Sequence, residues 1–180
     1  TKFLKDFENA EYVVIPSASC TGFVNNYYSK IYGNTSNQNA TKDIDGKVFE
    51  LSDFLVNVLK KIDLGASLQG TATYHDSCAA LRECKIKTEP RKLLENVKGL
   101  KLIDLQDNET CCGFGGTFAV KFEAISVAMG EQKVQHIVDT KADYLISTDL
   151  SCLMHIGGVM EKMEIPVKSL HLADVLASGY

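Results

Sequence analysis

Two adjacent cysteines, Cys111 and Cys112, stand in the run Glu-Thr-Cys-Cys-Gly-Phe-Gly-Gly of this 180-residue chain. Neighbouring cysteines are poorly placed to form a disulfide with each other, because a disulfide needs well-separated Cα atoms and suitably aimed Cβ vectors. They can offer two thiolates to a metal from one turn of backbone, and thiolates select zinc, copper(I) or iron–sulfur clusters. The glycines that follow allow positive φ angles and close approach to a bulky group. The run therefore predicts a soft-metal site, and we favour an iron–sulfur one.

The composition is that of an ordinary globular protein, with 45% hydrophobic and 23% charged residues. A net charge of −4 gives no reason to expect nucleic acid or an anionic membrane as a partner. No apolar run reaches the roughly 18 to 20 residues of a transmembrane segment, and we expect no secretory leader. Six cysteines without an export signal favour a reducing compartment, so we expect a cytoplasmic protein whose clustered cysteines bind metal.

An internal repeat relates Cys20 to Cys152. Residues 10–20 align without a gap with residues 142–152, which lie 132 positions later. In both segments an acidic residue and a tyrosine lead into an apolar run, and a small polar loop ends in Ser-Cys, which is typical of a buried parallel strand and its following loop. No first Cys-Cys-Gly run is present. We therefore expect residues 1–66 to be the tail of a first cysteine-rich repeat with connecting helices, and residues 67–180 to be a complete second one.

Strands that alternate with helices predict an α/β fold, a mostly parallel layered sheet with helices on both faces. The predicted strands are 71–75, 100–105, 144–147 and 167–170. The predicted helices are 22–32, 48–62, 90–97, 153–163, 172–177 and a long one from an N-cap at Thr117 to about 140. Residues 33–46, rich in Gly, Asn, Ser, Thr and Asp, predict an exposed loop. The loops that carry Cys78, the Cys-Cys pair and Cys152 all follow strands, so they can converge at one edge of the sheet.

The spacing of these cysteines resembles that of a known family. Thirty-two residues separate Cys78 from Cys111, and thirty-six separate Cys112 from Asp149, which opens Asp-Leu-Ser-Cys152. This is similar to the cysteine-rich CCG domain found in the B-type subunit of heterodisulfide reductase and in related iron–sulfur oxidoreductases. In that domain a cysteine, a Cys-Cys-Gly run and a Cys-x-x-Cys motif follow one another. Segments 75–78, 111–118 and 147–154 look closest to the lactate-utilisation protein A (LutA) branch.

The resemblance implies an iron–sulfur electron-transfer subunit of an oxidoreductase complex that oxidises L-lactate to pyruvate. It also implies partners among other iron–sulfur oxidoreductase subunits, similar to LutB and LutC. The implied ligands of a 4Fe-4S type cluster are Cys78, Cys111, Cys112 and Cys152. Asp149 replaces the first cysteine of the final motif with a harder oxygen donor, so a five-cysteine cluster is not expected here. No catalytic residue is assigned, because the chain has no catalytic triad and no flavin or nicotinamide fingerprint.

Two other hypotheses use the same cysteines. The first is a structural zinc module that mediates subunit assembly, with all four thiolates bound to a closed tetrahedral ion. The second is a metal-free redox protein in which Cys111 or Cys112 is the reactive thiolate.

The remaining candidates are weaker. His75, three residues before Cys78, either orients a thiolate or is an ordinary hydrogen-bonded histidine at a strand end. Cys20 belongs to the incomplete repeat, and Cys84 is expected to pack in the interior. The charged stretch 82–91 is expected to be a solvated helix and loop.

Overall fold

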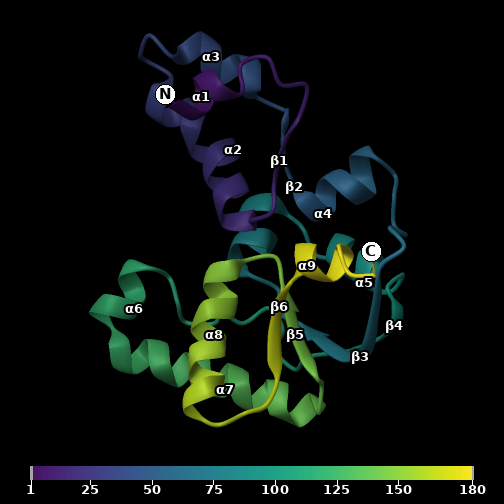
Figure 1. Ribbon diagram of the computed structural model, residues 1–180. Helices are drawn as coiled ribbons and strands as arrows, with labels where there is room; N and C mark the ends of the chain where they lie inside the picture. Colours follow the sequence, from purple (N-terminus) through teal and green to yellow (C-terminus); the bar gives the residue numbers. More distant parts are fainter. Residues whose placement is uncertain (1, 180) are drawn as a thin grey trace.

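A parallel four-stranded sheet forms the centre of the computed structural model, which describes residues 2–179 (Figure 1). The strands are β3 (Ser67–Tyr74), β4 (Lys98–Ile103), β5 (Tyr144–Ser147) and β6 (Lys168–His171). Their spatial order is β4-β3-β5-β6, and each neighbouring pair is parallel. All four predicted strands are therefore present, and the α/β fold is confirmed.

Helices cover both faces of this sheet, as predicted (Figure 1). They are α5 (Glu89–Leu94), α7 (Glu123–Thr140), α8 (Leu150–Lys162) and α9 (Leu172–Leu176). Successive residues of a strand point to opposite faces. Ile146 thus packs with residues of α5 and α9, whereas Leu145 packs with residues of α7 and α8. Both side chains are fully buried, so the sheet is the middle layer of a three-layer core.

A second, two-stranded parallel sheet lies near the N-terminus and joins β1 (Val13–Ile15) to β2 (Val48–Glu50). The helices around it are α1 (Lys2–Asp6), α2 (Ala18–Tyr32) and α3 (Gln38–Ile44), and they enclose a separate apolar cluster. Strand β1 is followed by α2 and, after α3, by its parallel partner β2, much as β5 is followed by α8 and its parallel partner β6. The sequence repeat predicts β1 and the loop after it but not β2, and the assignment of residues 1–66 to an incomplete repeat stays a prediction.

Two predictions between residues 33 and 62 are wrong. Helix α3 lies inside the segment predicted as a loop, because Ile44 and Thr41 are buried against the N-terminal cluster. The segment predicted as a helix over 48–62 starts with strand β2, because pairing with β1 satisfies the backbone hydrogen bonds of these residues. The helical part is limited to α4 (Leu51–Asp53) and the π-helical turn η1 (Phe54–Val58).

The long helix predicted from Thr117 is also interrupted. Phe122, with φ −130° and ψ 51°, lies outside the helical region and separates α6 (Thr117–Lys121) from α7. The N-cap of α6 is Gly116 rather than Thr117, which is the first helical residue. None of the helices between residues 2 and 179 combines the length and apolarity that crossing a lipid bilayer requires.

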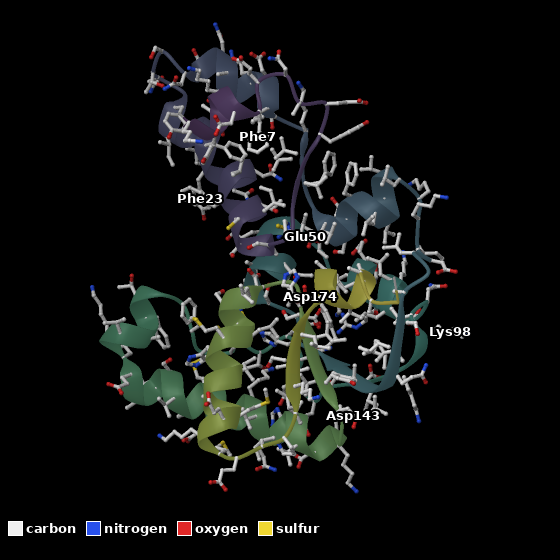
Figure 2. All side chains as sticks on the ribbon, in the orientation of Figure 1. Phe7, Phe23, Glu50, Lys98, Asp143 and Asp174 are labelled. Atoms are coloured by element: carbon white, nitrogen blue, oxygen red, sulfur yellow. The ribbon has the colours of Figure 1, made fainter. Side chains whose placement is uncertain are left out.

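The carboxyl ends of the two sheets face each other. The loop after β1 contacts the loop after β5, where Asp149 accepts hydrogen bonds from Ser17 and Ser19. Helix α2 packs on the π-helical turn η2 (Ala80–Cys84), and Gly22 permits this because a Cβ there would stand 2.4 Å from Glu83 Cβ. Glu50, at the end of β2, lies at this junction (Figure 2).

Candidate metal centre

The cysteine-bearing loops leave the sheet at its topological switch point. The chain moves from β3 outward to β4 and then crosses back to β5 on the other side of β3. Loops at such a point diverge above the carboxyl ends of the strands and leave room for a ligand. The loop after β3 carries His75 and Cys78, and the loop after β4 carries the Cys-Cys pair. Cys152 lies in the first turn of α8, which follows β5.

Three donor side chains form a compact, buried group at this point. One ring nitrogen of His75 and the sulfur atoms of Cys112 and Cys152 all lie within 4.8 Å of one another. The exposed fractions of these residues are 0%, 2% and 7%. They follow three different strands, β3, β4 and β5, so only the tertiary fold brings them together.

The other two predicted ligands lie beside this group. Cys78 and Cys111 are half-buried and close to each other. Cys112 is also near enough to raise the pKa of Cys78 electrostatically. Arg82 lies near Cys78, and it also borders the open cavity of about 610 Å³ that Cys111 lines. The structure therefore brings together all four cysteines predicted as ligands, with Cys111 nearest the surface.

The thiols of Cys112 and Cys152 lie close together and influence each other's ionisation. A hydrogen bond from the Cys152 thiol and the proximity of the His75 ring lower the pKa of Cys112 to about 4, against the effect of burial. The same contact with Cys112, together with burial, raises the pKa of Cys152. Burial and the neighbouring Cys111 raise the pKa of Cys78. The lowered pKa of Cys112 favours its thiolate, which is the form that binds a metal.

The Cys-Cys loop is held against α7 through Gly113. This residue has a φ of +96°, and a Cβ would stand 2.6 Å from the carbonyl oxygen of Ser126. The Ser126 hydroxyl donates to the Gly113 carbonyl over 2.8 Å. The Gly113 N–H donates to Cys111 Sγ over 3.5 Å, and the Phe114 N–H donates to Cys112. Glycine is required here by both conformation and space.

The backbone of His75 is fixed to β5 on both sides. Its N–H donates to the Ile146 carbonyl over 2.9 Å, and its carbonyl accepts from the Ser147 hydroxyl over 3.0 Å. The next residue, Asp76, is 1% exposed and receives both terminal nitrogens of Arg91 at 2.8 and 2.6 Å. This paired, two-point contact fixes the loop between His75 and Cys78.

Asp149 does not join the donor group. Its Oδ1 accepts from Ser19 over 2.7 Å and from Ser17 over 3.3 Å, and its Oδ2 accepts from Ser77 over 2.5 Å. Both oxygens of this buried carboxylate are therefore occupied by hydroxyl groups.

The remaining candidates lie outside the group. Cys20 is exposed on α2, and Cys84 packs inside, with its thiol donating to the Ala18 carbonyl. His171 accepts from the Ala173 N–H and contacts the Thr148 carbonyl, and His155 contacts the Ser126 carbonyl.

The sequence analysis missed two charged residues near the site. Arg91, predicted to be solvated, is largely buried and lies over the ring of Tyr74 at 5.0 Å. Lys133 is 2% exposed, and its ammonium group donates to the Asp107 carbonyl over 2.5 Å. Burial lowers the pKa of this lysine, while nearby Asp107 and Cys112 favour its charge. Its place on the apolar stripe of α7, between Gly130 and Ile137, is the signal that could have identified it.

The donor set fits a soft or borderline metal. Thiolates and a neutral imidazole suit zinc, copper(I) and iron–sulfur centres, whereas calcium and magnesium prefer oxygen ligands. Both ring nitrogens of His75 are buried without a hydrogen-bond partner in the described part of the chain. An unsatisfied buried donor or acceptor is costly, and a bound metal would satisfy one of these two atoms.

Comparison with known proteins places this site in a family. A family model described as a cysteine-rich domain, CCG, matches residues 72–157. The chain is 46% identical over 175 residues to lactate utilization protein A of Geobacillus sp. (strain WCH70), covering 97% of this chain and 74% of the relative. The chain belongs to the lactate utilization protein A family. A member from Halalkalibacterium halodurans is 47% identical over 173 residues, which is 96% of this chain and 71% of the relative.

A solved structure supports the fold alone. The crystal structure of a hypothetical protein from Helicobacter pylori aligns with a TM-score of 0.52 and 12% identity. The match covers 84% of this chain but spans only about a third, 32%, of that longer chain.

Proposed function

We propose that this chain is an iron–sulfur electron-transfer subunit that serves lactate utilization, in the oxidation of L-lactate to pyruvate. The observation that carries the proposal is the convergence of four cysteines, from the segments that follow three different strands, at the switch point of a parallel sheet. The names of the relatives, lactate utilization protein A, supply the physiological setting.

In this proposal the centre is held by the four predicted cysteines, Cys78, Cys111, Cys112 and Cys152. An iron–sulfur cluster of the 4Fe-4S type would supply one-electron chemistry that protein side chains lack. The protein surrounds the inner thiols with apolar residues, among them Leu105, Leu145 and Leu153. Backbone N–H groups of Gly113 and Phe114 point at the sulfur atoms of the Cys-Cys pair. Burial and such hydrogen bonds set the reduction potential of a thiolate-bound centre.

We further propose that the protein works with other iron–sulfur oxidoreductase subunits, similar to LutB and LutC, in the cytoplasm. Electron transfer through this chain requires a donor and an acceptor, so lactate oxidation itself would take place with the partners. The cysteine-rich composition, with all six cysteines free, supports a reducing compartment.

A structural zinc ion is the second candidate, and one observation favours it. Donor atoms on a single tetrahedral zinc ion, with bonds of about 2.0 to 2.3 Å, stand roughly 3.5 to 3.8 Å apart. The three atoms of the compact group lie within 4.8 Å of one another, which is close to that spacing. Thiolates bound to separate irons of a cluster stand further apart, because the inorganic core lies between them.

The metal content of anaerobically purified protein tests both candidates. The electron-transfer proposal predicts roughly four irons and four sulfides per chain and a broad visible absorption band that bleaches on reduction. Zinc alone, at about one per chain and without colour, would overturn it in favour of the structural module.

Two variants test the assignment of the ligands. Cys112→Ser is expected to lose most of the bound metal, at least tenfold against the wild type. The matched control is Cys84→Ser, since this cysteine lies outside the group and a serine can still donate to the Ala18 carbonyl. Equal metal retention in the two variants would contradict the role of Cys112.

A further inference from the structure

His75 is a fully buried histidine with no hydrogen-bond partner for its ring. Its exposed fraction is 0%, and neither Nδ1 nor Nε2 has a partner within the described residues. Leaving a buried polar atom unsatisfied costs about 1 to 3 kcal/mol, so such atoms are rare in native proteins. Two unsatisfied nitrogens on one ring therefore need an explanation.

Two other histidines, His155 and His171, have polar partners for ring nitrogens, as a structural histidine normally does. His171 uses both ring nitrogens, one toward the Ala173 N–H and one toward the Thr148 carbonyl. His155 has its Nε2 3.3 Å from the Ser126 carbonyl. The surroundings of His75 offer its ring no such carbonyl or hydroxyl among the described residues, although its own backbone N–H and carbonyl are both hydrogen-bonded to β5.

What the ring of His75 faces is sulfur. One of its ring nitrogens and the sulfurs of Cys112 and Cys152 all lie within 4.8 Å of one another. Small shifts would bring three such atoms to the separations of about 3.5 to 3.8 Å found around one tetrahedral ion. The fixed backbone of His75 and the Asp76–Arg91 ion pair hold the loop while leaving the ring free to bind.

The alternative extra donor, Asp149, is already occupied. The resemblance in sequence places it where the family has a cysteine, yet its oxygens accept hydrogen bonds from Ser17, Ser19 and Ser77. Imidazole and thiolate ligands both suit soft and borderline metals, whereas a carboxylate is a harder donor. An imidazole is therefore the better additional ligand beside thiolates.

We infer that His75 is a direct nitrogen ligand of the metal centre, beside Cys112 and Cys152. This inference rests on the proposed metal–thiolate centre and adds to it a histidine that follows directly from the end of β3. Ligation satisfies one of the two unpartnered nitrogens. A neutral imidazole changes the ligand set and charge distribution of a metal–thiolate centre, so the ligand would also affect the redox properties.

X-ray absorption at the edge of the bound metal, iron or zinc, tests this inference on anaerobically purified protein without a histidine tag. Imidazole bound to a metal gives a characteristic outer-shell scattering pattern that thiolates do not give. We expect this pattern in the wild type and in the control His155→Gln. We expect it to be absent from His75→Cys, in which a thiolate keeps the metal in place at no less than about half of the wild-type content.

The outcomes separate the two proposals. A wild-type protein that binds metal without imidazole scattering, or a His75→Cys variant that keeps the scattering, overturns the inference and leaves the metal–thiolate centre intact. A wild-type protein that binds no iron or zinc overturns both. If His75→Cys does not fold, as circular dichroism would show, His75→Gln takes its place, and the same loss of imidazole scattering is expected from the metal it retains.

Discussion

The hydroxyl of Ser17 donates a hydrogen bond to Asp149 Oδ1 over 3.3 Å, and these two residues occupy equivalent positions of the sequence repeat, 132 residues apart. Each stands three residues before a Ser-Cys cysteine, Cys20 in one case and Cys152 in the other. The loops after β1 and β5 therefore meet through the same position of each copy. Asp149 therefore forms a contact between the two parts of the chain instead of joining the donor group.

Asp149→Ala is expected to destabilise the protein by about 1 to 3 kcal/mol, because it removes the acceptor of three serine hydroxyls, one of which is buried. Urea unfolding would measure the change, with Ser19→Ala as a control that removes one hydroxyl and costs about 0.5 to 1.5 kcal/mol. We expect the metal content of Asp149→Ala to equal that of the wild type. Loss of metal from a folded variant would mean that this carboxylate is a ligand after all.

Removing Arg91 should be costly, since Asp76 is 1% exposed and has this guanidinium as its charged partner. Arg91→Met is expected to lower the free energy of unfolding by about 3 to 5 kcal/mol, the usual penalty for leaving a buried charge unpaired. The double variant Asp76→Asn with Arg91→Met should recover part of the loss. Additive effects of the two single changes would show that the pair does not act as a unit.

Two glycines in the Cys-Cys loop differ in what a side chain would meet. Gly113 and Gly116 both have positive φ, +96° and +56°, but only at Gly113 would a Cβ clash, 2.6 Å from the Ser126 carbonyl oxygen. Gly116→Ala should therefore cost about 1 to 3 kcal/mol from backbone strain alone. Gly113→Ala should cost clearly more and should also lower metal content by displacing Cys112. Similar thermal stabilities for the two variants would argue against close packing of this loop on α7.

Stability at the junction of the two sheets should depend on pH through Glu50. Burial raises the pKa of this carboxyl above its usual value near 4.5, although hydrogen bonds from Ser52 and Asp53 oppose the effect. A raised folded-state pKa favours the protonated form, so Glu50 contributes stability at low pH that is lost as pH rises through its folded pKa. Glu50→Gln should therefore gain stability relative to the wild type as pH increases from 4.5 toward neutrality.

Urea unfolding of both proteins between pH 4.5 and 8 would check this difference. Gln can still accept the N–H groups at the start of α4, so the helix cap is kept. The exposed Glu95→Gln is the matched control and should show no such trend. A stability difference between Glu50→Gln and wild type that stays constant with pH would contradict the assignment.

Much of the fold follows from local patterns in the sequence. The continuous apolar run 144–147 predicts a strand buried on both faces. The apolar periodicity of α8 predicts a helix with one buried face. The wrong predictions concern segments whose secondary structure is determined by contacts with residues distant in the sequence. Val48 to Glu50 follow a helical pattern but form β2, since β1 supplies their backbone hydrogen bonds from 35 residues away.

The sequence by itself determined the spacing of Cys78, Cys111, Cys112 and Cys152 and the parallel strands that precede them, and hence that these thiols meet at one sheet edge. Only the tertiary structure decided which neighbours each donor has. His75 faces sulfur because its backbone is fixed to β5, whereas Asp149 faces serines because the two sheets meet at their carboxyl ends. Spacing along a chain sets which loops can converge, but the desolvation and contacts of each side chain arise only when those loops pack.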